Sequence, residues 1–228
     1  MPHVLAAPDK FRGTLTAREA AEAVASAATA AGWDCDIAPV SDGGEGFLDV
    51  FTGIGSLQTA RVSGPLGQEV QVQWVLGRDP DSPGSTIAVV ESARAIGLGV
   101  IGGAKNNDPV HASSAGLGQL VAIAARAGAH QILIGMGGSA TTDGGLGAVE
   151  ALAPNGRLPS AELLAVSDVE TKFLDAPAIF GPQKGATPAQ VELLKRRLER
   201  VAQLYQERFG KDVRDIPGSG AAGGLGGG

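Results

Sequence analysis

The sequence predicts an α/β fold built around a parallel sheet, and three stretches of the chain support this prediction. Residues 3–6, 36–40 and 131–134 are short and largely apolar, and each is followed by a loop that is polar or rich in glycine. An alanine-rich helical pattern separates the first two. Parallel sheets bind their ligands beyond the carboxyl ends of the strands, so we expect a site in these loops.

The N-terminal part reads as strand, loop, helix and strand. After the strand at residues 3–6, Thr16 and Glu19 fit a capping box, in which each side chain accepts a hydrogen bond from the other residue's backbone N–H. The helix then runs to Gly32, a residue type that favours the end of a helix. The second strand, 36–40, ends at the loop 41–46.

The middle of the chain changes character. Residues 59–75 alternate loosely between polar and apolar, with a turn at 64–67 that predicts two antiparallel strands. A further strand at 86–91 and a helix at 116–128 precede the strand at 131–134. This change predicts two domains, residues 1–55 and 56–228, with the boundary near residues 53–60.

The clearest helix comes later. Thr187, Pro188 and Gln190 match an N-cap, a first helical residue and the far side of a capping box. Apolar residues then recur at helical spacing, while most of the basic ones lie on other faces and are expected to be solvated. The glycine-rich segment 218–228 has little to stabilise a helix, so we expect it to be loosely held.

Composition restricts the function. The 228 residues are 43% hydrophobic and 18% charged, as in a globular protein of one or two domains. A net charge of −6 argues against a general nucleic-acid binder, which is usually basic. Cys35 is the single cysteine and there is neither a signal sequence nor an apolar run of membrane-spanning length, so a cytoplasmic protein with no membrane partner is expected.

The segment 135–147 is the most informative motif. Its glycines, between a strand and an expected helix, allow backbone N–H groups to approach an anion, and the helix dipole favours phosphate there. Ser139 and Thr141 add hydroxyl groups, and Asp143 adds a carboxylate suited to a metal or to proton transfer. The loop therefore predicts an anion site.

Two other strand ends carry charge. Asp42 and Glu45 could hold Mg²⁺, which prefers one or two carboxylates with water and substrate phosphates. Alternatively, Asp42 stabilises a turn and Glu45 caps a helix. Lys10 and Arg12, beside Asp9, could bind a carboxylate or phosphate, or could be ordinary surface charges.

Other motifs fit known sites less well. The loop 181–185 lacks the spacing of a P-loop. Gly135, Gly137 and Ala140 fit the dinucleotide pattern G-x-G-x-x-A, but no suitable acidic residue follows about twenty residues later. The three histidines lack the spacing of metal ligands.

Taken together, five motifs in order resemble those of the bacterial glycerate kinase family, of the glycerate 2-kinase type. They are residues 7–13, 41–46, 137–145, 180–187 and 218–224, and they span essentially the whole chain. The resemblance implies two dissimilar α/β domains with the active site in the cleft between them. It also implies transfer of the γ-phosphoryl group of ATP, with Mg²⁺, to a hydroxyl of D-glycerate, with 2-phosphoglycerate as the favoured product.

The chain departs from the family pattern at three places. Lys10-Phe11-Arg12 stands where the family usually has Ser-Phe-Lys, and Thr142 stands where it often has Asn. The family also continues beyond the last glycine-rich motif. Residues 1–55 are therefore expected to be the first part of a Rossmann-like domain whose remainder lies further along a longer chain.

The resemblance also implies roles for individual residues. For glycerate binding these are Asp9, Lys10, Arg12 and Ser41, and for nucleotide binding Gly137, Gly138, Ser139, Thr141 and Gly181. Asp42 is expected to accept the hydroxyl proton or, with Glu45, to hold Mg²⁺, and the other catalytic candidates are Asp143, Asp168 and Lys184. Two alternatives remain: a nicotinamide-dependent oxidoreductase, and a truncated module that binds glycerate without turnover.

Overall fold

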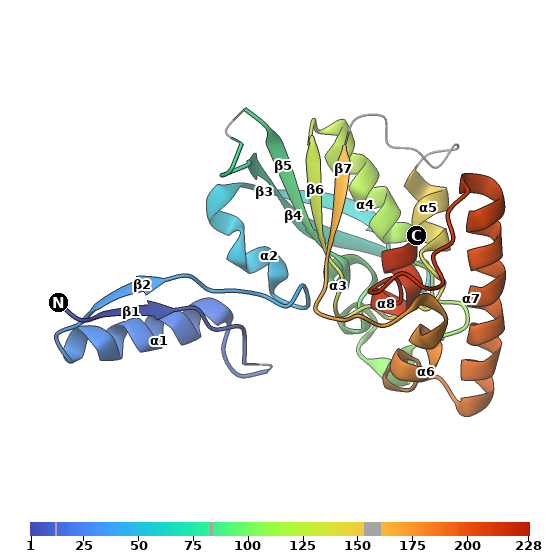
Figure 1. Cartoon of the computed structure of the whole chain (residues 1–228), viewed down its shortest axis with the longest axis horizontal. Helices are drawn as coiled ribbons and strands as arrows, with labels where there is room; N and C mark the ends of the chain where they lie inside the picture. Colours follow the sequence, from blue (N-terminus) through green and yellow to red (C-terminus); the bar gives the residue numbers. More distant parts are fainter. Residues whose placement is uncertain (12, 83, 153–160) are drawn as a thin grey trace.

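A five-stranded mixed sheet forms the body of the protein, and a small β–α–β unit projects from it (Figure 1). The computed structural model describes residues 1–11, 13–82, 84–152 and 161–228. The α/β fold predicted from the sequence is confirmed. None of the helices in these ranges is both long and apolar enough to cross a membrane.

The small unit consists of β1 (His3–Ala6), α1 (Ala17–Ala30) and β2 (Asp34–Ile37), with β1 parallel to β2. The capping box forms as predicted: the Glu19 N–H donates to the Thr16 hydroxyl, and the Thr16 N–H donates to the Glu19 carboxylate. The predicted strand 36–40 begins two residues earlier, because pairing with β1 sets its register. Backbone hydrogen bonds from Ala38 and Val40 continue the pairing irregularly beyond β2.

The large sheet has the order β3-β4-β5-β6-β7. β3 (Gly55–Ser63), β4 (Glu69–Arg78) and β5 (Thr86–Glu91) pair antiparallel, whereas β6 (Gln131–Gly135) and β7 (Glu162–Val166) continue from β5 in parallel. The predicted hairpin, its turn and the strands at 86–91 and 131–134 are confirmed. β7 completes the parallel part of the sheet and was not predicted from the sequence.

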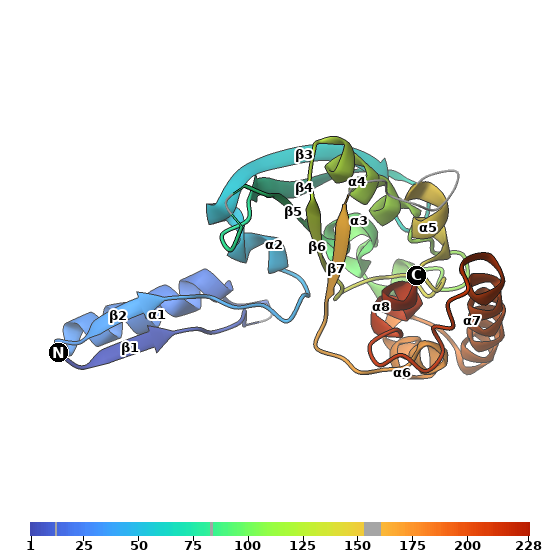
Figure 2. The ribbon, with the colours of Figure 1, turned by 45° about the horizontal axis from the view of Figure 1, so that its top comes forward.

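Helices cover both faces of this sheet (Figure 2). On one face α3 (Ser92–Ile96) and α4 (Ala115–Arg126) lie over the strands, and Leu117 and Leu120 pack in one core with Val90 and Ile132. On the other face α2 (Phe47–Val50) places Phe47 and Leu48 against β4 and β5. The sheet is thus fixed from both sides, and its strand ends form a rigid base for the loops.

The remaining helices are α5 (Leu146–Leu152), α6 (Ala176–Phe180), α7 (Pro188–Phe209) and α8 (Ala221–Gly224). Of these, α5 packs against α4, and α6 packs against α7 and α8. The predicted capping box of α7 is present, and Leu194, Leu198, Val201 and Tyr205 are buried. The basic face of α7 is mostly exposed, as expected, although Arg197 donates a hydrogen bond to the Val110 carbonyl.

The expectation that residues 218–228 are loosely held is wrong. Ala221 and Leu225 are buried, the Gly220 N–H donates to the Thr171 carbonyl, and the Gly144 N–H donates to the Gly223 carbonyl. The physical reason is the small size of glycine, because a Cβ at Gly227 would lie within 3 Å of the Phe173 ring. Glycine therefore allows the backbone itself to pack as a core element here.

Candidate active site

A cleft of about 1450 Å³ runs along the carboxyl ends of β5, β6 and β7 and meets the loops of the small unit. Its lining includes Lys10 and Asp42 from those loops, Gly137 and Ser139 after β6, and Asp168 after β7. Residues from the two parts of the chain thus share one cavity, at the strand ends where the sequence predicted a site.

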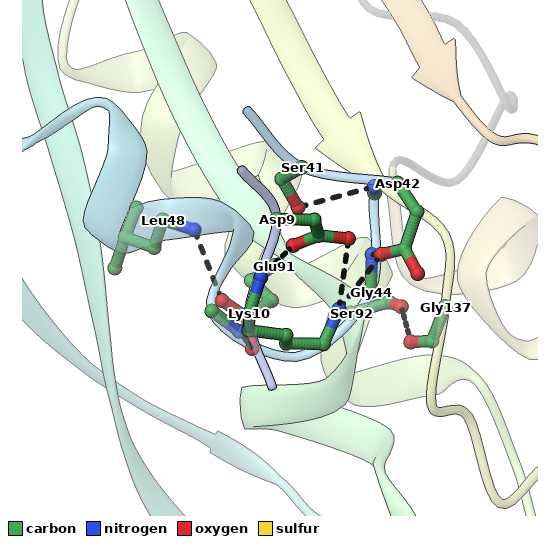
Figure 3. A network of polar contacts seen from close by, with 11 residues as sticks. Asp9, Lys10, Ser41, Asp42, Gly44, Leu48, Glu91, Ser92 and Gly137 are labelled. Carbon is green, nitrogen blue, oxygen red and sulfur yellow. Dashed lines mark hydrogen bonds and ion pairs between the residues drawn. The ribbon is translucent and has the colours of Figure 1, made fainter. Parts of the chain in front are cut away.

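The loop after β2 carries Asp42, an exposed carboxylate of the predicted set, close to Lys10. The Nζ of Lys10 lies 3.0 Å from Oδ1 of Asp42 and 3.5 Å from Oδ2 of Asp9, and the Gly44 N–H donates to Asp42 (Figure 3). Burial lowers the pKa of Lys10, but the hydrogen bonds and charges of Asp42 and Asp9 outweigh it and raise the pKa above its usual value. Lys10 is therefore a firmly charged cation, and the Asp42 side chain remains 40% exposed.

Close backbone contacts join this loop to the large sheet. The Gly137 N–H donates to the Gly43 carbonyl at 2.9 Å, and the Ser92 hydroxyl donates to the Gly137 carbonyl at 3.1 Å. A Cβ at Gly43 would overlap the Val166 carbonyl at the end of β7. The glycines of the loop are therefore required for Asp42 to lie this close to the turn after β6.

Lys184 enters the cleft from the predicted loop 181–185. Its side chain is almost fully buried, and its Nζ donates to the Thr141 carbonyl at 2.6 Å and weakly to the Ser139 hydroxyl at 3.5 Å. Burial lowers the pKa of Lys184 to about 7, although the negative charge of Asp143 opposes this shift. A buried cation that lines a cleft can neutralise an anion brought to it.

Asp143 has a different environment from that of Asp42. Its carboxylate accepts hydrogen bonds from the backbone and hydroxyl of Ser114 at 2.8 Å each, and from the N–H groups of Gly145 and Gly147. It is buried and is not part of the cleft lining. The N–H groups at the amino end of α5 therefore already bind an anion, the carboxylate of Asp143.

The cleft brings together most of the predicted site residues. Those that line it are Asp9, Lys10, Asp42, Glu45, Gly137, Gly138, Ser139, Asp168 and Lys184. Ser41, Thr141, Asp143 and Gly181 lie outside the lining, and Arg12 lies outside the described residues. Ser41 and Gly181 instead shape their loops, since Ser41 accepts from the Gly43 N–H and Gly181 accepts from the Lys184 N–H.

Several lining residues were not identified from the sequence. Among them, Glu91 and Arg94 come from the end of β5 and from α3, and Ala222 comes from the last glycine-rich loop. Glu91 ends an apolar strand at the same edge as the other loops, which is the one sequence signal that could have indicated it. Ala222 adopts a positive φ of 51°, which could not be foreseen for a residue other than glycine.

The oxygen donors of the cleft are compatible with Mg²⁺. No group of three or more potential metal ligands occurs in the ranges that the structure describes. Asp42 and Glu45 nevertheless line one cavity, and Mg²⁺ often takes only one or two carboxylates and completes its shell with water and phosphate oxygens. The donor set therefore fits a metal that arrives with a phosphorylated ligand.

The geometry argues against a dinucleotide site. In such a site the glycine motif opens directly into a helix whose amino end binds the pyrophosphate. Here α5 begins at Leu146, six residues after Ala140, and Asp143 occupies its amino end.

Comparisons with known proteins agree on one family. The model of the glycerate kinase family matches residues 4–155 and 153–228. An uncharacterised protein of Mycobacterium bovis is 42% identical over 99% of this chain, and glycerate 2-kinase of Escherichia coli (strain K12) is 34% identical over 98%. The crystal structure of a "putative glycerate kinase 2" from Salmonella typhimurium LT2 has a TM-score of 0.83 at 32% identity, with 99% of this chain and 68% of that chain covered. The chain spans 61% of the length of the Mycobacterium protein and 66% of that of the Escherichia coli enzyme.

Proposed function

The chain belongs to the glycerate kinase family, and we propose that in a family-length form it transfers the γ-phosphoryl group of ATP to a hydroxyl of D-glycerate, giving 2-phosphoglycerate and ADP. The observation that carries the proposal is the shared cleft. An exposed carboxylate with a charged lysine, Asp42 and Lys10, lines the same cavity as the buried cation Lys184 and the glycine turn 137–139. Phosphoryl transfer needs positioning and charge neutralisation more than covalent chemistry.

The proposed acceptor end of the cleft is formed by the small unit. Lys10 binds the glycerate carboxylate, together with Arg12. Asp9 acts by accepting from the Lys10 N–H, and Ser41 by shaping the loop that carries Asp42. Asp42 is the proposed general base, because it lines the cavity, its side chain stays 40% exposed, and it lies beside the charged Lys10. It would accept the proton of the attacking hydroxyl group.

The proposed donor end is the loop after β6. Backbone groups of Gly137 and Gly138 and the Ser139 hydroxyl hold the phosphates of ATP, and Lys184 stabilises the charge that develops on the transferred group. Thr141 acts indirectly, since its carbonyl fixes the Lys184 ammonium. Gly181 also acts indirectly, since its carbonyl accepts from the Lys184 N–H in the turn that carries Lys184. Asp143 acts on Lys184 through its negative charge, which favours the charged ammonium.

Mg²⁺ would be held by Asp42 and Glu45, with Asp168, which follows β7 and lines the same cleft. When bound, such a metal neutralises charge on the phosphate oxygens during transfer. If Asp42 is a metal ligand, it is less available as the base, and the two roles predict different responses to Mg²⁺ concentration.

We also propose that the chain divides into residues 1–55 and 56–228, and that the protein works in the cytoplasm on small molecules. The projecting β–α–β unit supports a division of the chain, because its two short strands have no further partner strand among the described residues. α2, although it lies within residues 1–55, packs on the large sheet and so belongs with the body. The relatives are longer than this chain, and a longer form could supply strands to this unit.

The test is a coupled ADP-release assay with D-glycerate on the family-length protein, with phosphorus NMR to identify the product. Turnover that requires both ATP and Mg²⁺ and gives 2-phosphoglycerate supports the proposal. Tight NADH binding without ATP binding would overturn it in favour of an oxidoreductase. Glycerate binding without turnover would indicate a binding module.

A further inference from the structure

Glu91 is a buried carboxylate to which the proposed reaction gives no role. It lies at the end of β5 and is 1% exposed. Its two oxygens accept hydrogen bonds from the Gly46 N–H at 3.3 Å, from the Leu48 N–H at 3.0 Å and from Arg94 Nε at 3.3 Å. A buried charge is tolerated only with such partners, so its retention here needs a reason.

Arg94 extends this contact to two further elements. Its guanidinium donates to Asp49 on α2 at 2.6 Å and to Gln73 on β4 at 3.2 Å, in addition to Glu91. Glu91 and Arg94 together therefore fasten the start of α2 to β4 and to β5, in which five of the six residues are buried.

The fastened segment is the one that carries Asp42. The loop 41–46 is held at Gly43 by the Gly137 N–H and at Gly46 by Glu91. Glu91 also accepts from Leu48 at the start of α2, directly after the loop (Figure 3). The small unit projects from the body (Figure 1), and the chain re-enters the body through this loop. The contacts of Glu91 thus help to set the distance between Asp42 with Lys10 and the turn 137–139.

We propose that Glu91, oriented by Arg94, is a positioning residue that places the Asp42 loop against the turn after β6 for phosphoryl transfer. The expected effect on kcat rests on the proposed function, whereas the expected effect on the loop 41–46 does not. The charge of Glu91 is essential to it, because only a carboxylate accepts from all three donors. In a glutamine, the side-chain NH₂ group is itself a donor, so it would face at least one of the three donors without forming a hydrogen bond.

The variant Glu91→Gln therefore tests the proposal in two ways. In hydrogen exchange on the 228-residue chain, the Gly46, Leu48 and Gly137 amides should exchange about tenfold faster or more, while amides in the centre of β5 and β6 keep their protection. In the family-length protein, kcat should fall about ten- to a hundredfold with a small change in the KM for ATP, because binding is retained while the alignment is lost.

Controls separate this role from general stability. Asp108→Asn removes another carboxylate that accepts two backbone N–H groups, outside the cleft lining, and should leave exchange at Gly46 and Leu48 unchanged. If Glu91→Gln does not fold, Arg94→Met is measured instead and should show the same local pattern more weakly.

Uniform acceleration of all amides, or unchanged exchange at Gly46 and Leu48 in a folded variant, would overturn the proposal. So would normal kcat in the family-length variant. If the wild-type protein has no glycerate kinase activity, the proposed function fails while the exchange data still decide whether Glu91 holds the loop.

Discussion

The ammonium group of Lys184 lies 2.6 Å from the carbonyl oxygen of Thr141, in the buried wall of the cleft. No carboxylate among the described residues forms an ion pair with it, and the charge of Asp143 acts from further away. A cation held mainly by a carbonyl dipole is poorly compensated, and an incoming phosphate would complete its environment.

The poor compensation of Lys184 predicts a pH-dependent stability. The pKa of Lys184 is lowered by burial to about 7, so between that pH and the ordinary lysine pKa the unfolded chain binds more protons than the folded one. The free energy of unfolding should therefore rise with pH from about 7 to 9, by at most about 1.4 kcal/mol per pH unit. Lys184→Met should remove this slope.

Denaturant unfolding of both proteins across that range measures the effect. Subtracting the free energy of unfolding of Lys184→Met from that of the wild type removes the contribution of groups that titrate alike in both proteins. Parallel curves for the two proteins would show that Lys184 stays charged in the folded state.

Asp42→Asn should reduce kcat of the family-length protein by about 10²–10⁴ and change glycerate affinity much less. The reason is that the amide can keep the contact with the Gly44 N–H but cannot accept a proton. Steady-state kinetics at saturating Mg²⁺ measure this, with Asp36→Asn as the control, because Asp36 lies on β2 outside the cleft lining. Near-normal turnover would remove Asp42 from the chemistry.

The substitutions Ala222→Gly and Gly223→Ala should change the free energy of unfolding in opposite directions. Ala222 has a φ of 51°, a strained value for a residue with a Cβ, so Ala222→Gly should be neutral or stabilise by up to about 1 kcal/mol. A Cβ at Gly223 would overlap the Thr141 carbonyl and lie 3.0 Å from the Lys184 Nζ, so Gly223→Ala should destabilise by about 1–3 kcal/mol. Chemical denaturation compares the two, and equal effects would contradict the packing described for this loop.

The small β–α–β unit should be the least stable structured part of the 228-residue chain. A pair of four-residue parallel strands without a third strand is marginal in water. Amides of β1 and β2 should exchange faster than those of β5 and β6, and the family-length form should slow them. Equal protection of both sheets in the short chain would show that the unit needs no further strands.

Much of the fold could be predicted because its signals are local. The capping boxes of α1 and α7 each depend on residues three apart, and the hairpin of β3 and β4 depends on one turn. β7 was missed, and the start of β2 was misplaced, because pairing with a distant strand decides where such short strands begin.

The sequence by itself determined the α/β class, the family and the set of loops that meet at the strand ends. Only the tertiary structure decided which side chains of those loops reach the cleft. Asp42 and Asp143 both follow strands in glycine-rich motifs, yet one is partly exposed beside Lys10 and the other is enclosed by four hydrogen bonds. Some of these bonds are local, but the decisive ones are not: Ser114 with Asp143, Thr141 with Lys184 and Gly46 with Glu91 lie 29 to 45 positions apart. Burial and hydrogen bonding at that range depend on how the elements pack, which no local pattern specifies.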